Sequence, residues 1–132
     1  MASLDRPVVK PRPVYLDLFH IRQPLPAIVS ILHRASGLLL FLIGIPLLLW
    51  VVQRALASPE GWAQMRATLA HPFAKLVLIA LAWSYFHHLI AGIRHLVMDL
   101  HIGMTLKPAR QSAAITLVLG VLLTLGVAIK LW

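Results

Sequence analysis

Hydroxyl, imidazole and guanidinium groups follow one face of an otherwise apolar segment near the start of the chain. Four residues at spacing i, i+3, i+4 and i+7 share this helical face: Ser30, His33, Arg34 and Gly37. A serine can instead bond its own helix carbonyl, and an arginine can extend to lipid phosphates. The pairing of Ser30 with Arg34 one turn later is therefore what indicates a ligand site.

A second polar face occurs further along the chain. Its members are spaced i, i+4, i+7 and i+11, again on one side of a helix: His88, Gly92, His95 and Asp99. A helix through these residues runs back toward the end that carries Ser30, so the two faces lie at similar depth. The adjacent His87 points about 100° away from His88, and we expect it to pack between helices.

Ionisable groups in hydrocarbon are costly unless paired, so two polar faces at matched depth predict a polar group between them. A b-type haem needs an imidazole for iron, a small residue one turn away and cations for its propionates. His88, Gly92 and then Arg34, Arg94 or His95 could supply these. A quinone head group needs donors such as Ser30 and Arg34. Spacing alone also allows His88 to be only an interhelical hydrogen-bonding residue.

Long apolar segments carry these residues. Runs without Lys, Arg, Asp or Glu cover residues 35–52, 76–93 and 111–129. At about 1.5 Å rise per residue, each run reaches about 27 Å, enough to cross the hydrocarbon of a bilayer. We therefore predict an all-α integral membrane protein with a single membrane-anchor domain over 1–132. Its polar tail covers 1–26, and its three transmembrane helices cover about 27–53, 73–98 and 111–131.

Local signals predict the remaining elements. Ser58, Pro59 and Glu60 are typical of a helix start, so we expect a short interfacial helix over 58–70. Pro46 removes a backbone donor within the first span and predicts a kink there. Small residues recur every four positions on the third span and predict close helix packing: Ser112, Thr116, Gly120, Thr124 and Ala128.

Composition excludes several function classes. Of the residues, 60% are hydrophobic and 12% are charged, which is unlike a soluble domain. The net charge of +8 is concentrated between the apolar runs, without the basic and aromatic pattern typical of nucleic-acid binding. The chain has no cysteine, so disulfides, thiolate chemistry, iron–sulfur ligation and Cys-x-x-Cys-His haem attachment are excluded within it.

The distribution of basic residues predicts orientation. Eight of the twelve lie before or at the start of the first span or around the second loop, and four lie on the opposite side. The positive-inside rule then places the N-terminus in the cytoplasm. The first run is too long and too far from residue 1 for a signal peptide, and the proline-rich tail is unlike a transit peptide. We expect a bacterial inner membrane protein.

These residues belong to stretches that resemble a known family, the cytochrome b membrane-anchor subunits of succinate dehydrogenase (succinate:quinone oxidoreductase, respiratory complex II). RPVYLDL at 12–18 is similar to the family's R-P-V-x-L-D-L, and SILHRASG at 30–37 is similar to S-I-L-H-R-x-S/T-G. HLIAGIRHLVMD at 88–99 is similar to H-x-x-x-G-x-R-H-x-x-x-D. The resemblance covers residues 12–132.

The resemblance implies roles for individual residues. His88 corresponds to the axial ligand of haem iron, and Ser30 and Arg34 correspond to residues that line the ubiquinone site. Gly92 corresponds to a haem-packing position. Less specifically, the resemblance implies that His33, Arg94 and His95 contact the haem propionates or support the iron-ligating histidine.

The resemblance also implies partners. Haem b would be shared with a second small anchor subunit, which supplies the other axial histidine and completes the helical bundle of which this chain is half. A flavoprotein and an iron–sulfur subunit on the cytoplasmic side would oxidise succinate, since this chain has no dinucleotide glycine motif and no cysteine. The chain is then no enzyme on its own, but a non-catalytic anchor that docks these subunits to the lipid membrane and shares the quinone site.

Two alternatives stay open from the sequence. A haemless fumarate reductase-type anchor has a similar fold, although the pattern of His88 and Gly92 argues against it. A structural three-helix membrane subunit would use its histidines only for packing, and would leave Ser30 without a ligand.

Overall fold

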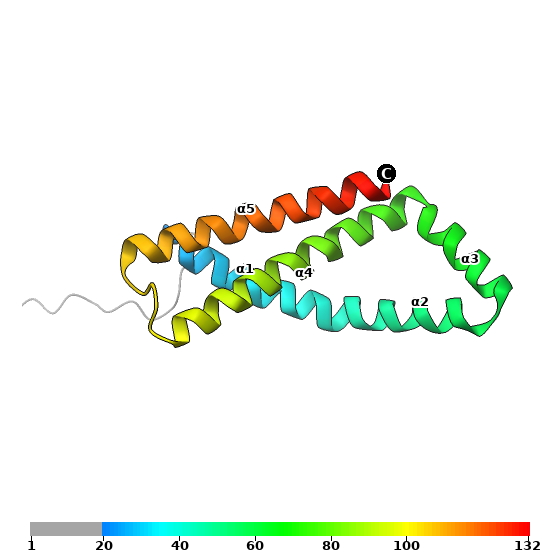
Figure 1. The fold of residues 1–132 in the computed structure, drawn as a ribbon, viewed down its shortest axis with the longest axis horizontal. Coiled ribbons are helices and arrows are strands. Elements are labelled where there is room, and N and C mark those ends of the chain that lie inside the picture. The colour runs from blue at the N-terminus through cyan, green and yellow to red at the C-terminus, as the bar shows by residue number, and fades with distance from the viewer. Residues whose placement is uncertain (1–19) are drawn as a thin grey trace, which may run out of the picture.

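The computed structural model describes residues 20–132, which form helices joined by short connections (Figure 1). No strand occurs within this range. In chain order, the helices are α1 (Leu25–Leu39), the π-helical turn η1 (Leu40–Gly44), α2 (Ile45–Ala57), α3 (Pro59–Ala70), α4 (Pro72–Asp99) and α5 (Leu106–Leu131). The RPVYLDL motif and most of the predicted tail lie outside the described residues.

Three continuous helical stretches are long and apolar enough to cross a membrane: Leu25–Ala57, Pro72–Asp99 and Leu106–Leu131. The predicted all-α, three-span fold is thereby confirmed. The helices extend beyond the predicted segments, most clearly at α5, which begins five residues before 111. The predicted span began only at residue 111, directly after Arg110. In the structure the exposed side chains of Lys107 and Arg110 lie on the helix itself, where long basic side chains can reach polar headgroups.

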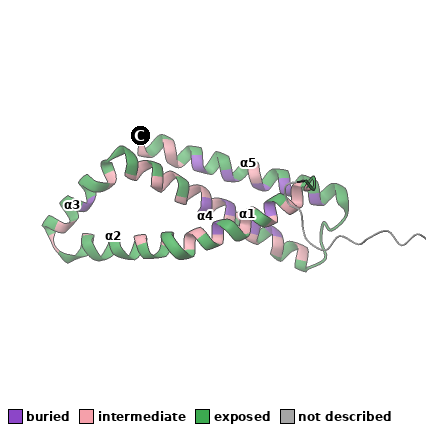
Figure 2. Ribbon diagram, turned by 180° about the vertical axis from the view of Figure 1, so that it is seen from behind, coloured by how far each residue is buried: buried purple, intermediate pink, exposed green. Residues whose placement is uncertain are grey.

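The helices α1, α4 and α5 pack against one another, whereas α2 diverges from α4 (Figure 1). Among the described elements, α2 contacts only η1 and α3, and α3 connects the far end of α2 with the start of α4. Figure 2 shows the same division, because buried residues gather where α1, α4 and α5 meet while α2 is largely exposed. The tightly packed part of the chain is therefore the end that carries both polar faces.

Small residues allow α5 to lie close to α4. Of the predicted small-residue face, Thr116, Gly120 and Thr124 are buried, whereas Ser112 and Ala128 are half-buried; Ala113, which was not predicted, is buried as well. A Cβ atom built on Gly120 would lie 3.7 Å from the Cα atom of His87 on α4. The threonine hydroxyls donate to carbonyls one turn earlier on α5, so they bring no unpaired polar group into the interface.

The irregularity predicted at Pro46 takes the form of a π-helical turn. The turn covers Leu40–Gly44 and ends where the N–H of Ile45 donates to the carbonyl of Leu40. Proline has no N–H to continue the normal helical ladder, and a wider turn beside it rearranges the local hydrogen bonds. α1, η1 and α2 together form one candidate span, Leu25–Ala57.

The start of α3 follows the predicted capping pattern. The Ser58 hydroxyl accepts a hydrogen bond from the N–H of Gly61 at 3.0 Å, and Pro59 occupies the first helical position. The Glu60 backbone N–H and the Ser58 hydroxyl both bond the Glu60 carboxylate, and they lower its pKa below the ordinary value. The 58–70 segment is thus a separate, capped helix between the first two spans.

We expect replacement of Gly120 by leucine to separate α4 from α5, because atoms beyond a Cβ would meet the backbone at His87. Overpacking of this kind costs about 1–3 kcal/mol. The Tm of the protein in detergent should fall relative to wild type. Gly126→Leu is the matched control, since a Cβ at Gly126 meets nothing within 4 Å. Equal Tm values for the two variants would contradict this packing.

Candidate histidine site between the first and second spans

Imidazole rings from α1 and α4 form a cluster where these helices pack. The ring centroids of His33 and His88 lie 4.1 Å apart, and their planes are nearly parallel at 11°. The centroids of His33 and His95 lie 5.1 Å apart, with an interplanar angle of 54°. The structure therefore brings together three residues that the sequence placed on two separate helical faces.

The His88 ring forms a hydrogen bond to the main chain of α1 through its Nδ1 atom. Nδ1 lies 2.9 Å from the carbonyl oxygen of His33 and 3.3 Å from the hydroxyl oxygen of Ser36. Because a carbonyl can only accept, Nδ1 must carry the proton in this arrangement. In a neutral ring, Nε2 then carries a free lone pair. That nitrogen is the one that can bind a metal.

Glycine allows this approach of α4 to α1. A Cβ on Gly37 would lie 2.7 Å from Cε1 of His88, closer than real Cβ contacts. Gly92 was predicted to leave space beside His88 for a flat cofactor. In the isolated chain this space faces the His33 ring, whose Nε2 would lie 3.5 Å from a Cβ on Gly92.

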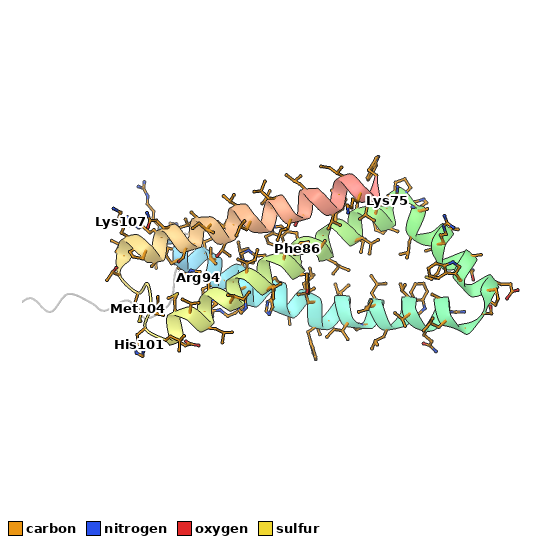
Figure 3. All side chains as sticks on the ribbon, viewed as in Figure 1. Lys75, Phe86, Arg94, His101, Met104 and Lys107 are labelled. Atoms are coloured by element: carbon orange, nitrogen blue, oxygen red, sulfur yellow. The ribbon has the colours of Figure 1, made fainter. Side chains whose placement is uncertain are left out.

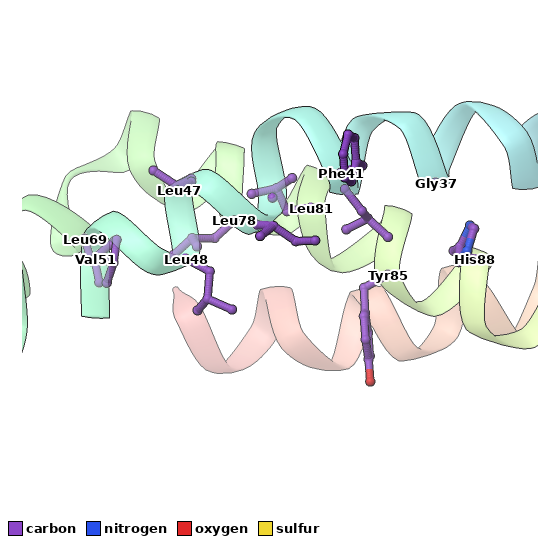
Figure 4. A pocket seen from close by; sticks show the side chains of 13 residues that line it. Gly37, Phe41, Leu47, Leu48, Val51, Leu69, Leu78, Leu81, Tyr85 and His88 are labelled. Carbon is purple, nitrogen blue, oxygen red and sulfur yellow. The ribbon is translucent and has the colours of Figure 1, made fainter. Parts of the chain in front are cut away.

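An apolar cavity extends from His88 toward α2 and α3. Its volume is about 640 Å³, and its walls come from η1, α2, α3 and α4 as well as Gly37. Figure 4 shows His88 at one end of the labelled group, with Phe41, Leu81 and Leu48 among the lining side chains. The cavity thus combines an imidazole with a hydrocarbon lining, which is typical of cofactor sites.

Ser30 and Arg34 lie on α1, about two turns and one turn before Gly37, respectively. Nε of Arg34 donates to the carbonyl of Ser30 at 3.4 Å, and the Arg34 side chain is exposed. Ser30 is half-buried. Along α1, Ser30 lies one turn before His33 of the histidine cluster, and Arg34 follows His33 directly.

Arg94 does not join this cluster. Its side chain is 7% exposed and turns toward α5, where Nε donates to the hydroxyl of Ser112 at 2.9 Å. A second nitrogen of the guanidinium donates to the carbonyl of Ala109 at 3.3 Å. Figure 3 shows Arg94 within the bundle, whereas Lys107 extends from its end. In the structure, Arg94 links α4 to α5 through these two hydrogen bonds.

His87 packs as predicted. Its side chain is fully buried, and its ring is stacked on Trp83 with centroids 5.2 Å apart. Gly120 of α5 lies against its backbone. Neither ring nitrogen makes a hydrogen bond within residues 20–132.

The sequence reasoning missed Ser36. Its hydroxyl donates to the carbonyl of His33 at 2.9 Å, and its side chain is 2% exposed. The available signal was its place in SILHRASG, at a position where the family pattern has serine or threonine. Its spacing from Ser30 gave no indication, because Ser36 is six residues later and lies off the predicted face.

No group of three or more His, Cys, Asp or Glu side chains within the described range could hold a metal ion. A metal bound at His88 would need most of its ligands from a cofactor or another chain. The fold and site thus define the class, a multi-pass membrane protein whose first two spans hold an imidazole beside an apolar cavity.

Comparison with known proteins gives the family. Residues 9–127 match the model of the succinate dehydrogenase/fumarate reductase transmembrane subunit family. The chain is 37% identical to the succinate dehydrogenase cytochrome b556 subunit of Coxiella burnetii over 92% of this chain and 97% of that protein. It is 33% identical to the protein of the same name from Paracoccus denitrificans over 77% and 78% of the respective chains. The chain belongs to the cytochrome b anchor subunits of succinate dehydrogenase, and it is a membrane anchor of complex II.

We expect Arg94→Leu to destabilise the protein, because it removes two hydrogen bonds between α4 and α5. Hydrogen bonds to charged groups contribute about 1.5–3 kcal/mol each, and membrane interiors often give less. Thermal unfolding in detergent would measure the loss. Arg110→Leu, at an exposed position on α5, is the control. If both variants kept the wild-type Tm, this role of Arg94 would be wrong.

Proposed function

We propose that this chain binds one side of a haem b through His88 and contributes Ser30 and Arg34 to a ubiquinone reduction site. In this role it serves electron transfer from succinate to ubiquinone. The observation that carries the proposal is the hydrogen bonding of His88. Its Nδ1 is engaged by the α1 carbonyl of His33, so the lone pair for iron is on Nε2.

The surroundings of His88 suit a porphyrin. The adjacent cavity of about 640 Å³ has a largely hydrocarbon lining, which matches the apolar body of the macrocycle. A porphyrin brings four nitrogen ligands, so one histidine from this chain and one from a partner would complete the coordination of the iron. This agrees with the lack of any three-ligand cluster in residues 20–132. When bound, haem b supplies a one-electron redox centre.

His33 and His95 are the proposed partners of the haem propionates, since their rings cluster with His88. Gly92 keeps its proposed role as a haem-packing position, with the His33 ring as its present neighbour. An Arg94 contact with a propionate would require the guanidinium to leave Ser112 and Ala109. Arg94 is therefore the weakest member of the proposed set.

Ser30 and Arg34 offer what a quinone head group needs. A hydroxyl and a guanidinium one helical turn apart can donate to a quinone carbonyl oxygen and stabilise the charge that develops during reduction. Arg34 is exposed in the isolated chain, and its Nε bond to the Ser30 carbonyl is long at 3.4 Å. The Arg34 guanidinium can therefore turn toward a ligand at small cost.

Other chains must supply the remaining chemistry. This chain has no cysteine for iron–sulfur clusters, and we propose that it is non-catalytic by itself. A flavoprotein and an iron–sulfur subunit would dock at the end that carries Ser30. A second small anchor subunit would give the other axial histidine and cover the exposed apolar faces, completing the bundle.

The basic residues support an orientation with the N-terminus and the second loop in the cytoplasm. Ser30, Arg34 and the histidine cluster then lie near the cytoplasmic surface, on the side where the soluble subunits would dock. Both similar proteins come from bacteria, which supports a bacterial inner membrane as the location.

A haemless fumarate reductase-type anchor is the second candidate, because the matched family includes fumarate reductase subunits. The orientation of His88 beside an apolar cavity favours the haem-bearing form. A reduced-minus-oxidised absorbance spectrum of the purified complex separates the two candidates.

His88→Ala should abolish or strongly alter the b-type spectrum of the purified complex, because it removes the proposed iron ligand. The measurement is haem content per complex with the reduced-minus-oxidised spectrum. His101→Gly is the control, since His101 is exposed in a loop at φ 61°, where glycine is unstrained. Wild-type haem content and spectrum in His88→Ala would refute the ligand assignment.

Ser30→Ala and Arg34→Leu should each lower ubiquinone reduction by roughly 10-fold or more, as expected for loss of a donor to developing charge. Succinate oxidation with a soluble electron acceptor should be unchanged, because that reaction does not use the membrane site. Arg110→Leu removes an exposed arginine from α5 and should spare both reactions. Equal losses in both assays would indicate failed assembly and contradict a specific quinone role.

A further inference from the structure

We propose that Ser36 and Gly37 are positioning residues for the iron ligand. Together with the main-chain carbonyl of His33, they fix the orientation and the tautomer of the His88 ring, so that Nε2 is the nitrogen presented for binding. The inference rests on the proposed haem function and deepens it. Ser36 and Gly37 would act through His88, without touching the iron themselves.

The Ser36 hydroxyl has a defined direction. Its proton is donated to the carbonyl of His33 at 2.9 Å, and the same carbonyl accepts from Nδ1 of His88 at 2.9 Å. With its proton used in this way, the hydroxyl oxygen 3.3 Å from Nδ1 can only accept. His88 Nδ1–H therefore faces two acceptors and no donor, which selects a single tautomer.

The same contacts oppose rotation of the ring. A half-turn about the Cβ–Cγ bond would exchange Nδ1 with a carbon, and both acceptors would then face a C–H group. The His33 ring covers one face of His88, with centroids 4.1 Å apart. Because Ser36 is 2% exposed, water has little access to replace a lost bond. The ring is thus held in orientation as well as in protonation.

Gly37 sets the distance between the ring and α1. A Cβ at this position would lie 2.7 Å from Cε1, 3.1 Å from Nδ1 and 3.6 Å from Nε2 of His88. Nε2 is the most distant of these three ring atoms. Any side chain at residue 37 would push the ring from the helix and lengthen the bond to the His33 carbonyl.

This arrangement affects ligand strength as well as geometry. An N–H donated to a backbone carbonyl raises the electron density at the opposite ring nitrogen. It also orients the ring before the metal binds, so less entropy is lost on binding. Loss of such an outer contact typically costs roughly 10- to 100-fold in metal affinity. Ser36 and Gly37 should therefore govern haem retention without contacting haem iron.

The test uses the whole purified complex carrying Ser36→Ala or Ser36→Thr. The g values of low-spin ferric haem depend on the orientation of the axial imidazole, so we expect Ser36→Ala to shift and broaden the EPR signal. Transfer of haem to excess apomyoglobin should become roughly 10- to 100-fold faster. Ser36→Thr retains a hydroxyl and matches the family pattern, so it should restore wild-type behaviour.

Ser84→Ala is the matched control. Ser84 is also a buried helical serine, 1% exposed, but its hydroxyl donates to the Ala80 carbonyl of its own helix. Its variant should keep the wild-type EPR signal and transfer rate. A Ser36→Ala complex identical to wild type would overturn the proposal, and so would equal changes in the Ser36 and Ser84 variants.

Gly37→Ala provides an independent arm, with Gly126→Ala as its control because a Cβ at Gly126 meets nothing within 4 Å. We expect lower haem content or an altered EPR signal only in Gly37→Ala. Wild-type behaviour of both Gly37→Ala and Ser36→Ala, with haem lost in His88→Ala, would overturn this inference and leave the proposed function intact. A wild-type complex without haem would instead refute the proposed function.

Discussion

The contact between the His88 ring and the main chain of α1 is the constraint around which the packed end of the molecule is arranged. A side chain can bond the carbonyl of a neighbouring helix only if the helices approach closely, and Gly37 provides that approach. The contact joins residues 55 positions apart in the chain. It thereby fixes the relative depth of α1 and α4, and with it the depth of Ser30 and Arg34 beside the histidine cluster.

The helix α4 is shared between two different interfaces. Toward α1 it presents His88, Gly92 and His95, and the hydrogen bond at Nδ1 of His88 leaves the lone pair of that ring on Nε2. Toward α5 it presents His87 and Arg94, whose contacts join helices. Adjacent histidines thus have opposite surroundings, because successive residues on a helix point about 100° apart. The small-residue face of α5 secures one side of α4, so the other side can be held in a defined register.

The divergence of α2 from α4 leaves the second half of the first span without contacts to α4 or α5. Large apolar side chains such as Leu56 and Ile129 are 80% and 79% exposed. Within a bilayer this surface is satisfied by lipid or by further helices. The apolar cavity beside His88 is lined by the diverging helices α2 and α4, together with η1 and Leu69 of α3. We propose that another membrane chain completes this site and shares its cofactor.

The sequence alone determined the three-span helical fold, the capped helix after Ser58 and the small-residue face of α5. These features depend on hydropathy, capping and spacing, which are local properties. It also predicted that His88 and Ser30 share one depth of the membrane. Tertiary structure decided which partners each group takes. Arg94 bonds α5, and Ser36 bonds the carbonyl that holds His88, because such contacts depend on the rotation and separation of helices distant in the chain, which local spacing does not specify.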